Sequence, residues 1–450
     1  MTLLELSRQL AARKITSREL VEQSLAAIDD PDGEGSRTFI QVHRDAAFAA
    51  AARIDYERRK GASLPVLAGI PISIKDNFDE AGIVTRAGSR VLATAPAATN
   101  DAAAVARLRA AGAVIIGRTN MTEFAYSGLG INPHYGTPRN VYDRPAARIP
   151  GGSSSGAAIS VIDGMAAGAI GTDTGGSVRI PAALNGLVGF KPTARRIPLE
   201  GVLPLSLTLD SAGPICRTVE DCVLLDRVMS ASDTELPAVG MRGLRLAVPG
   251  TIVLDELDAP VAAAFSATCT ALSAGGVEIV DLPLRELARA AEVNPRGALS
   301  SAEAYGWHRS LIARAADQYD PRVIARIRPG EAISAADYLD MLEKRRRFVN
   351  EVNLAVDGFD ALLMPTTPAT APTIDEVVTT DASYFRFNTR MLRNPSLVNT
   401  FDGCALSIPC HHPGEAPVGL MLAGTQGRDG HVLSVGLAIE KLLAGIHRGI

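Results

Sequence analysis

The sequence predicts a mixed α/β fold in which helices cover both faces of a central mixed β-sheet. Residues 101–117 and 244–280 each combine a helical pattern with short apolar runs typical of buried strands, which favours parallel pairing. Two further apolar runs, 405–410 and 418–424, flank a turn containing proline and glycine, which favours an antiparallel pair. The chain has 450 residues and is 47% hydrophobic, enough to bury a large core.

The N-terminal part is typical of helices that lead into a first strand. The first 60 residues have helical patterning, and Thr16 and Glu19 match the capping box that begins a helix. Isoleucines then alternate in the run LAGIPISIKD (67–76), which predicts a strand that ends at Lys75–Asp76.

The first helix-and-strand unit follows. Asp101 is expected to cap a helix and Gly112 to close it, before the buried strand AVIIG (113–117). Such an order of helix and strand is an ingredient of a parallel sheet.

A second unit with the same order lies in the C-terminal half. Apolar residues alternate over 244–248, a helix is expected over roughly 259–274, a pair of glycines ends it, and VEIV (277–280) is the next strand. Residues 431–443 then predict a closing amphipathic helix.

The chain is expected to form a single domain over residues 1–450. Residues 193–215 are irregular but too apolar for a free linker, and the sequence contains no internal repeat or low-complexity block. The expected domain has an N-terminal helical segment, a motif-bearing core region and a remainder, at residues 1–60, about 65–215 and 240–450.

Charge and terminal sequence exclude several classes of partner. The formal net charge is −4, and the basic run 344–347 is expected on a solvated helix face, so nucleic-acid binding is not predicted. The N-terminus has Glu5 within its apolar stretch, unlike a secretory signal, and no apolar run approaches the length of a membrane span. We therefore expect no membrane partner and leave a homodimer open.

The cysteines and histidines indicate neither disulfides nor a metal site. Five sparse cysteines without a C-x-x-C pair predict reduced thiols in a cytoplasmic protein. His411 and His412 form the one histidine cluster, without ligand spacing around it. We expect neither a metal nor another cofactor.

Two glycine- and serine-rich stretches, IPGGSSSG (149–156) and GTDTGGSVR (171–179), stand at the ends of a small, apolar segment. They allow three interpretations: glycine turns chosen for backbone geometry, a phosphate cradle, or a nucleophilic serine beside backbone N–H donors. Neither stretch contains a phosphate-loop pattern. A nucleophilic serine needs a base, and Lys75 is the candidate because it stands at a strand end before Asp76.

These stretches together resemble the amidase-signature hydrolases from about residue 20 to 445. The resemblance rests on matches in order and spacing, namely GIPISIKDN (69–77), AGAVIIGRTNMTEFAYSG (111–128), GTPRN (136–140), PGGSSSG (150–156) and GTDTGGSVRIPAALNGLVGFKPT (171–193). It implies the amidase-signature fold, in which a single domain has a mixed sheet covered by helices on both faces.

The resemblance also implies a Ser–Ser–Lys triad. Ser177 would be the nucleophile that forms the acyl-enzyme, Ser153 the bridging serine after a cis Gly152–Ser153 peptide, and Lys75 the base. To accept a proton near pH 7, Lys75 needs a pKa lowered by about three units, which burial can supply. The backbone N–H groups expected to form the oxyanion hole are those of Thr174, Gly175, Gly176 and Ser177.

Other residues near these loops are expected to support the site. By resemblance, Asp173 and Arg179 make hydrogen bonds behind the nucleophile, although an ordinary surface ion pair is the alternative. Ser154 and Ser155 are expected to cap the following helix rather than to transfer protons.

The acyl group is expected to contact the segment at Ala125, Tyr126 and Ser127, for which a purely structural role is equally open. No Lys or Arg cluster lies near these residues in the sequence, which favours a neutral acyl group. Tyr305, Trp307 and His308 are candidates for the mouth of the pocket, within the variable region 290–400, while the tryptophan is equally compatible with a core position.

The function expected from this pattern is hydrolysis of a small carboxamide to carboxylate and ammonia. The alternative is the glutaminase (A) subunit of a tRNA-dependent amidotransferase, which belongs to the same family. The stretch LSSAEAYGWHRSLIARAADQYDPRV (299–323) departs from that subunit's glutamine-recognition pattern, and MLRNPSLVNTFDG (391–403) lacks its acidic residue. Both departures favour a free-standing amidase.

Overall fold

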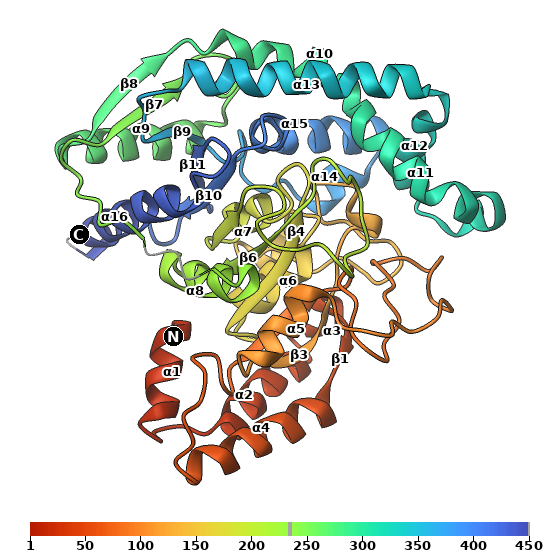
Figure 1. Ribbon diagram of the computed structural model, residues 1–450, viewed down its shortest axis with the longest axis vertical. Coiled ribbons are helices and arrows are strands. Elements are labelled where there is room, and N and C mark those ends of the chain that lie inside the picture. The colour runs from red at the N-terminus through yellow and green to blue at the C-terminus, as the bar shows by residue number, and fades with distance from the viewer. Residues whose placement is uncertain (233–235, 449–450) are drawn as a thin grey trace.

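The computed structural model describes residues 1–232 and 236–448 (Figure 1). Within these residues one mixed sheet has the strand order β1-β3-β2-β4-β6-β5-β10-β11-β9-β7-β8. Its strands are β1 Phe39–Val42, β2 Pro71–Lys75, β3 Val114–Thr119, β4 Gly168–Asp173, β5 Val188–Lys191, β6 Ser211–Cys216, β7 Arg245–Pro249, β8 Glu278–Leu282, β9 Ala361–Pro365, β10 Cys404–Pro409 and β11 Gly419–Gly424.

The sheet has parallel strands toward both ends and antiparallel strands in its middle. β3, β2 and β4 pair in parallel, as do β9, β7 and β8, so both predicted helix-and-strand units contribute parallel strands. From β4 through β6, β5, β10 and β11 to β9 the pairing is antiparallel. The predicted mixed sheet and the predicted pairing of β10 with β11 are confirmed.

The helices connect these strands and cover the sheet. Figure 1 shows α2 and α4 at one end of the molecule and α13 running along the opposite end. The α-helices are α1 Leu3–Ala11, α2 Ser17–Asp29, α3 Gly35–Thr38, α4 Arg44–Arg59, α5 Ala103–Ala110, α6 Ser155–Ile162, α7 Arg179–Leu184, α8 Val219–Ser230, α9 Ala259–Ala274, α10 Ala290–Val293, α11 Ala298–Ala315, α12 Pro321–Ile327, α13 Ala335–Ala355, α14 Ile374–Val378, α15 Asp381–Thr400 and α16 Asp429–Arg448.

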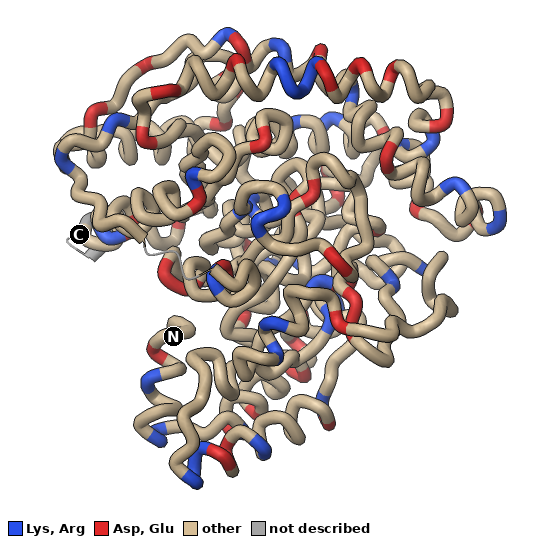
Figure 2. Tube along the Cα trace, in the orientation of Figure 1, with Lys and Arg blue, Asp and Glu red and all other residues tan. Residues whose placement is uncertain are grey.

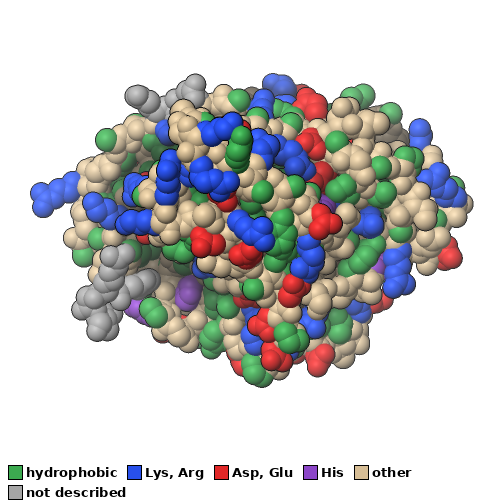
Figure 3. All heavy atoms as spheres, turned by 90° about the horizontal axis from the view of Figure 1, so that it is seen from below, with side chains coloured by type: hydrophobic (Ala, Val, Ile, Leu, Met, Phe, Trp, Pro, Cys, Tyr) green, Lys and Arg blue, Asp and Glu red, His purple; other side chains and the backbone are tan. Residues whose placement is uncertain are grey.

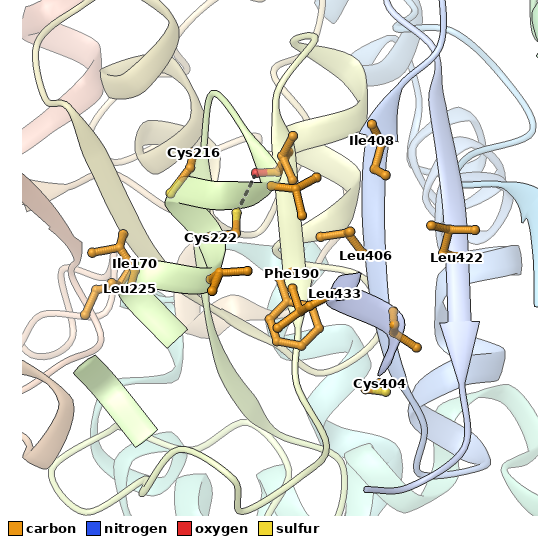
Figure 4. Packing of buried hydrophobic residues seen from close by; sticks show 14 of the residues in the cluster. Ile170, Phe190, Cys216, Cys222, Leu225, Cys404, Leu406, Ile408, Leu422 and Leu433 are labelled. Atoms are coloured by element: carbon orange, nitrogen blue, oxygen red, sulfur yellow. Dashed lines mark hydrogen bonds between the residues drawn. The ribbon is translucent and has the colours of Figure 1, made fainter. Parts of the chain in front are cut away.

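Alternate side chains of the strands enter cores on opposite faces of the sheet. Leu420 and Leu422 of β11 belong to the core that includes side chains of α8 and α16, whereas Met421 packs with side chains of α13 and α15. Figure 4 shows the first core, where Phe190 and Leu433 lie among aliphatic side chains of neighbouring strands. Helices therefore cover both faces, as the alternating pattern requires.

The N-terminal segment differs from the prediction in one element. Residues 39–42 form β1, which pairs antiparallel with β3 at the edge of the sheet, so the first 60 residues are not entirely helical. The capping box of Thr16 and Glu19 is present at the start of α2. The short strand was missed because its four residues lie between two helices and show no clear alternation.

The predicted cap at Asp101 is also wrong, whereas the predicted stop at Gly112 is confirmed. Ala102 precedes α5, and the Asp101 carboxylate instead accepts a hydrogen bond from the Ala81 N–H and pairs with Arg109. Gly112 has a φ of +84°, which favours glycine after the end of a helix.

Charged side chains of both signs are interspersed on the surface. Figure 2 shows acidic and basic residues together along α13, where Arg346 and Arg347 pair with Glu343 on the solvated face. Arg345 departs from that prediction, because it turns inward and lies 3.5 Å from Asp402. The face shown in Figure 3 likewise carries basic, acidic and apolar side chains near one another. Within the described residues, no helix combines the length and apolarity needed to span a bilayer.

Candidate active site

The two glycine- and serine-rich loops meet at one end of the buried element that separates them. The first loop leads into α6, β4 returns toward it, and the second loop follows β4 and leads into α7. The Ser154 N–H donates to the Ser177 carbonyl oxygen over 3.3 Å, and the Ser154 hydroxyl donates to the Thr172 carbonyl oxygen over 3.3 Å. The first loop is therefore bound to the second loop through backbone atoms and to the end of β4 through the Ser154 hydroxyl.

Lys75 lies at the end of β2, the strand that pairs in parallel with β4. Ile72 and Ile74 face the core beneath α8, so Ser73 and Lys75 point toward the opposite face, where Ser73 contacts Ser160 of α6. The Lys75 side chain is fully buried.

Two hydroxyl groups accept hydrogen bonds from the Lys75 amine. Lys75 Nζ donates to Ser153 Oγ over 2.7 Å and to Thr172 Oγ1 over 2.8 Å. Burial lowers the pKa of Lys75 from 10.5 to about 7, although the carboxylates of Asp173 and Asp210 oppose this shift. An amine with this pKa is partly neutral near pH 7 and can accept a proton from a hydroxyl partner.

Ser153 and Ser177 lie at the two loops that converge on Lys75. Both are buried, with Ser177 3% exposed, and the Gly152–Ser153 peptide is cis, as the resemblance implied. Ser153 is joined directly to Lys75. Across residues 1–232 and 236–448, no hydrogen bond joins the hydroxyls of Ser153 and Ser177, which are connected through the backbone of Ser154.

Asp173 and Arg179 form a buried ion pair behind the second loop. Arg179 donates to both carboxylate oxygens of Asp173 over 2.9 and 3.0 Å, and both side chains are fully buried. Asn399 of α15 bonds both partners. Although burial opposes ionisation, Arg179 and Asn399 hold the pKa of Asp173 well below its usual range. The alternative of a surface ion pair is therefore wrong.

The same carboxylate holds the turn that contains Ser177. The N–H groups of Gly176 and Val178 donate to Asp173 over 2.8 and 3.1 Å. Because the Gly176 N–H faces a carboxylate, it is the least suited of the four expected donors to bind an oxyanion. This contact leaves the N–H groups of Thr174, Gly175 and Ser177 as the better candidates.

A second buried carboxylate contacts the turn through a side chain. The Thr174 hydroxyl donates to Asp210, the residue immediately before β6. Asp210 also accepts hydrogen bonds from the N–H groups of Leu205 and Ser206 over 2.9 and 3.0 Å.

The capping roles expected for two serines are not observed. Ser154 is the residue before α6, but its hydroxyl makes no cap and instead donates to the Thr172 carbonyl oxygen. The Ser155 hydroxyl donates to the Asn120 carbonyl oxygen over 3.4 Å. Both hydroxyls thus connect the first loop to neighbouring strand ends.

The expected acyl-pocket segment is buried and conformationally unusual. Ala125 has a φ of +60° and the preceding Phe124 a φ of +48°, in the left-handed region that non-glycine residues seldom adopt. The Tyr126 hydroxyl lies 2.9 Å from the Ser301 hydroxyl of α11, and the Ser127 hydroxyl donates to Asn388 of α15 over 2.8 Å. The surrounding helices therefore fix this segment.

A cation from a distant part of the sequence lies beside this segment, where the local sequence has no Lys or Arg cluster. The Arg326 guanidinium stands 4.3 Å from the centre of the Tyr126 ring and donates to the Tyr126 carbonyl oxygen. No carboxylate within the described residues forms an ion pair with Arg326. Nearby, the buried Tyr384 hydroxyl lies beside Ser127 and lacks a hydrogen-bond partner among the described residues.

Two of the aromatic residues proposed for the pocket mouth, Trp307 and His308, pack on each other and on Phe124. His308 is fully buried and shares a hydrogen bond with the Tyr319 hydroxyl, while burial lowers the pKa of its imidazole to about 3. Trp307 is 38% exposed and packs against His308 and Phe124. Tyr305 is partly buried at the edge of the same cluster.

Sequence reasoning missed Thr172, Asp210 and Arg326. Thr172 stands in the quoted GTDTGGS stretch, but its contact with Lys75 depends on the parallel pairing of β2 with β4, which was not predicted. Asp210 and Arg326 lie in an irregular stretch and a variable helical region, where no local pattern indicated their contacts. Within the described residues, no cluster of His, Cys, Asp and Glu side chains is arranged to hold a metal ion.

Comparison with known proteins places this arrangement in a family. The family model described as Amidase matches residues 19–433. The chain is 36% identical to a 2-amino-5-chloromuconic acid deaminase of Comamonas testosteroni, over 89% of this chain and 87% of that protein. It is 33% identical to the A subunit of the glutamyl-tRNA(Gln) amidotransferase of Symbiobacterium thermophilum, over 97% of this chain and 96% of that protein.

A solved structure has the same fold over nearly the whole length. A protein described as an amidase superposes with a TM-score of 0.88 at 33% identity, covering 98% of this chain and 99% of that chain. The family match and the structural match both span the strands and loops that carry Lys75, Ser153 and Ser177. The chain therefore belongs to the amidase family and is a hydrolase that acts on amide C–N bonds.

Proposed function

We propose that the chain hydrolyses a small carboxamide to a carboxylate and ammonia through an acyl-enzyme on Ser177, with Ser153 as proton relay and Lys75 as base. The observation that carries this proposal is the 2.7 Å hydrogen bond from a fully buried Lys75 to Ser153. A lysine with a pKa near 7 can act as a general base at neutral pH, whereas an ordinary lysine is protonated.

Acylation needs the nucleophile to lose a proton as it attacks. Ser177 Oγ bonds to the amide carbon, its proton goes to Ser153, and the Ser153 proton goes to the neutral Lys75 amine. The carbonyl oxygen becomes an oxyanion, for which the N–H groups of Thr174, Gly175 and Ser177 are the proposed donors. Asp173 would fix this turn by binding the Gly176 N–H.

Collapse of the tetrahedral intermediate breaks the C–N bond. Ser153 donates a proton to the departing nitrogen and recovers one from Lys75, so ammonia leaves and Ser177 remains acylated. A water molecule then attacks the acyl carbon, with the same Ser153–Lys75 pair accepting its proton. The carboxylic acid leaves, and Ser177 regains its hydroxyl.

We also propose that the substrate carries a carboxylate in addition to its amide. Arg326 lies against the expected acyl-pocket segment without a carboxylate of the described chain to pair with, and a guanidinium suits a carboxylate ligand. The relative from Comamonas testosteroni is named for an acidic substrate, which supports the same class. The expectation of a neutral acyl group is replaced on this ground.

Release of ammonia by the purified chain tests the reaction. We expect hydrolysis of one or more small amides without ATP, tRNA or a second subunit. Ser177→Ala should abolish turnover while keeping the fold, as judged by circular dichroism. A fluorophosphonate should label Ser177, detected by peptide mass spectrometry, in the wild type and in the control Ser154→Ala. Labelling at Ser153 instead would contradict the assignment.

The amidotransferase alternative has its own outcome. If a broad amide panel gave no ammonia but added amidotransferase partner subunits produced glutamine hydrolysis, a glutaminase subunit would replace the free-standing amidase. The departures at residues 299–323 and 391–403 argue for the free-standing enzyme.

A pair of matched amides tests the substrate class. Arg326→Met should raise KM for a carboxylate-bearing amide about 10- to 100-fold, the loss expected for a hydrogen-bonded charge pair. KM for its neutral isostere should change little, and exposed Arg328→Met serves as the control. Equal changes in KM for both amides would assign Arg326 to the fold alone.

We further propose one domain and a reducing, cytoplasmic setting. Support for one domain is the continuous sheet, which takes strands from all three expected parts of the chain. Support for the setting is that all five cysteines are free thiols.

A further inference from the structure

Two carboxylates hold the turn around Ser177, one through its backbone and one through the Thr174 side chain, and their surroundings differ. Asp173 accepts from the turn's backbone and is neutralised by Arg179. Asp210 accepts from the Thr174 side chain, and no Lys or Arg of the described chain forms an ion pair with it. The turn is therefore bound by one carboxylate that has a cationic partner, Asp173, and by one that has none among the described residues, Asp210.

The Asp210 side chain is fixed in one orientation. One oxygen accepts from Thr174, and the other accepts from the N–H groups of Leu205 and Ser206. The next residue, Ser211, pairs with Asp173 in the β4–β6 ladder, and its hydroxyl donates to the Asp173 carbonyl oxygen over 3.1 Å. Asp210 and Thr174 therefore face each other across the ends of two paired strands.

The charged groups that act on Asp210 and Lys75 come from several elements. Lys75 of β2 donates to Thr172 of β4, and Thr172 pairs with Ala212 of β6, two residues after Asp210. The carboxylates of Asp173 and Asp210 both act on Lys75, and Glu303 of α11 acts on Asp210. Burial and Glu303 raise the pKa of Asp210 to about 6, against the hydrogen bonds from Thr174, Ser206 and Leu205. Above that pH Asp210 is mostly ionised and favours the protonated form of Lys75.

We propose that Asp210 is a positioning residue that fixes the oxyanion turn through Thr174 and supplies the negative charge that tunes Lys75. This inference rests on the proposed function of Lys75 and Ser177. The two effects are separable: the hydrogen bond to Thr174 sets the geometry of the turn, and the charge sets the pH at which Lys75 loses its proton.

Three variants separate geometry from charge. Asp210→Asn keeps the shape and loses the charge, so the acid limb of kcat/KM should move to lower pH by about 0.5 unit or more. Thr174→Val loses the hydroxyl and leaves the carboxylate in place, so kcat should fall about tenfold, while the acid limb should move less than in Asp210→Asn. Asp210→Ala loses both and should lower kcat about 100-fold.

The matched control is Asp221→Asn. Asp221 is also buried, its pKa is also raised to about 6, and it accepts from the Leu3 N–H; it lies on α8, which covers the face of the sheet opposite to Lys75. Its substitution should leave the acid limb in place. Because the substrate is not identified, the rate of Ser177 labelling by a fluorophosphonate serves as a second readout across pH.

The outcomes are distinct. The inference is overturned if the acid limb does not move in folded Asp210→Asn, or if kcat is unchanged in folded Thr174→Val. The proposed function stays intact in that case, provided that the wild type hydrolyses amides. A wild type with neither hydrolysis nor labelling at Ser177 overturns the proposed function instead. If Asp210→Ala does not fold, the other two variants still decide.

Discussion

Two lysines each end a strand of the same sheet, and both are buried, yet their surroundings differ. Lys75 ends β2, and its amine donates to the hydroxyls of Ser153 and Thr172. Lys191 ends β5, and its amine donates to the carbonyl oxygens of Pro192 and Gly403, each over 2.7 Å. Burial lowers the pKa of both lysines, to about 7 for Lys75 and about 8 for Lys191.

The difference teaches that burial alone does not make a lysine a base. A carbonyl oxygen only accepts hydrogen bonds, so Lys191 has no partner from which it can take a proton. A hydroxyl both donates and accepts, so a proton can move from Ser153 to Lys75. We therefore infer that Lys191 joins β5 to the start of β10, whereas Lys75 serves the chemistry.

The largest expected effect compares the same substitution at both lysines. Lys75→Met should lower kcat about 1,000-fold or more, because the proposed general base is lost. Lys191→Met should keep activity per folded molecule within about threefold. Ammonia release on the best amide of the panel measures both, after the folded fraction is determined by denaturant titration. A Lys191→Met variant as inactive as Lys75→Met would break the comparison.

The next effect concerns stability and runs in the opposite direction. At pH 9 Lys191→Met should lower the free energy of unfolding by about 1–3 kcal/mol, since two buried carbonyl oxygens lose their donor. Lys75→Met should cost less, because its hydroxyl partners Ser153 and Thr172 can rotate toward other acceptors. Urea unfolding of the three proteins tests this order of stability losses. A larger loss for Lys75→Met would mean that Lys75 stabilises the fold more than Lys191 does.

A smaller effect appears in the pH dependence of that free energy. Between about pH 7 and 10.5 the unfolded chain holds a proton on Lys75 that the folded chain has lost, so raising the pH stabilises the fold. The slope is at most about 1.4 kcal/mol per pH unit for one group. For Lys191 the same rise begins only near pH 8.

The interval from pH 7 to 8 therefore distinguishes the two lysines. The unfolding free energy of the wild type minus that of Lys75→Met should rise with pH across this interval. The corresponding difference for Lys191→Met should stay nearly flat until pH 8. Unfolding free energies from urea titrations at half-unit steps provide both differences. A flat Lys75 difference would show that the folded protein keeps the Lys75 proton across this interval, so that its pKa is not lowered to about 7.

The contrast between the lysines also explains which parts of the site could be predicted from the sequence. Lys75 was identified because a strand pattern ends there and a long motif surrounds it, and the mixed sheet followed from alternating and helical patterns. Ser153 was identified from the same motif, but nothing local marks Thr172 as a partner of Lys75. Thr172, 97 positions further along the chain, reaches Lys75 because β2 and β4 pair in parallel. Pairing between distant strands is decided by packing of the whole core.

The same limit applies to the substrate pocket. Arg326 approaches Tyr126 from a helix 200 positions away, and the sequence around it has no pattern that indicates this contact. Local periodicity predicted α9 and α16 well because each helix buries its own apolar face. β1 was missed, and the cap at Asp101 was predicted wrongly. In both cases a tertiary partner, β3 for β1 and Ala81 for Asp101, decides the local structure.

The smallest expected effect comes from Thr172, the second hydroxyl partner of Lys75. A hydroxyl partner can be changed by substitution, whereas the backbone carbonyl partners of Lys191 cannot. Thr172→Val removes an acceptor that favours the charged amine, so the acid limb of kcat/KM should move to lower pH and kcat should fall about three- to tenfold. Thr172→Ser keeps the hydroxyl and should stay close to the wild type in both respects. The pH profiles of the three proteins on one amide test this prediction. If Thr172→Val and Thr172→Ser gave the same profile, the 2.8 Å contact would only pack the strand ends together. Ser153 alone would then distinguish Lys75 from Lys191.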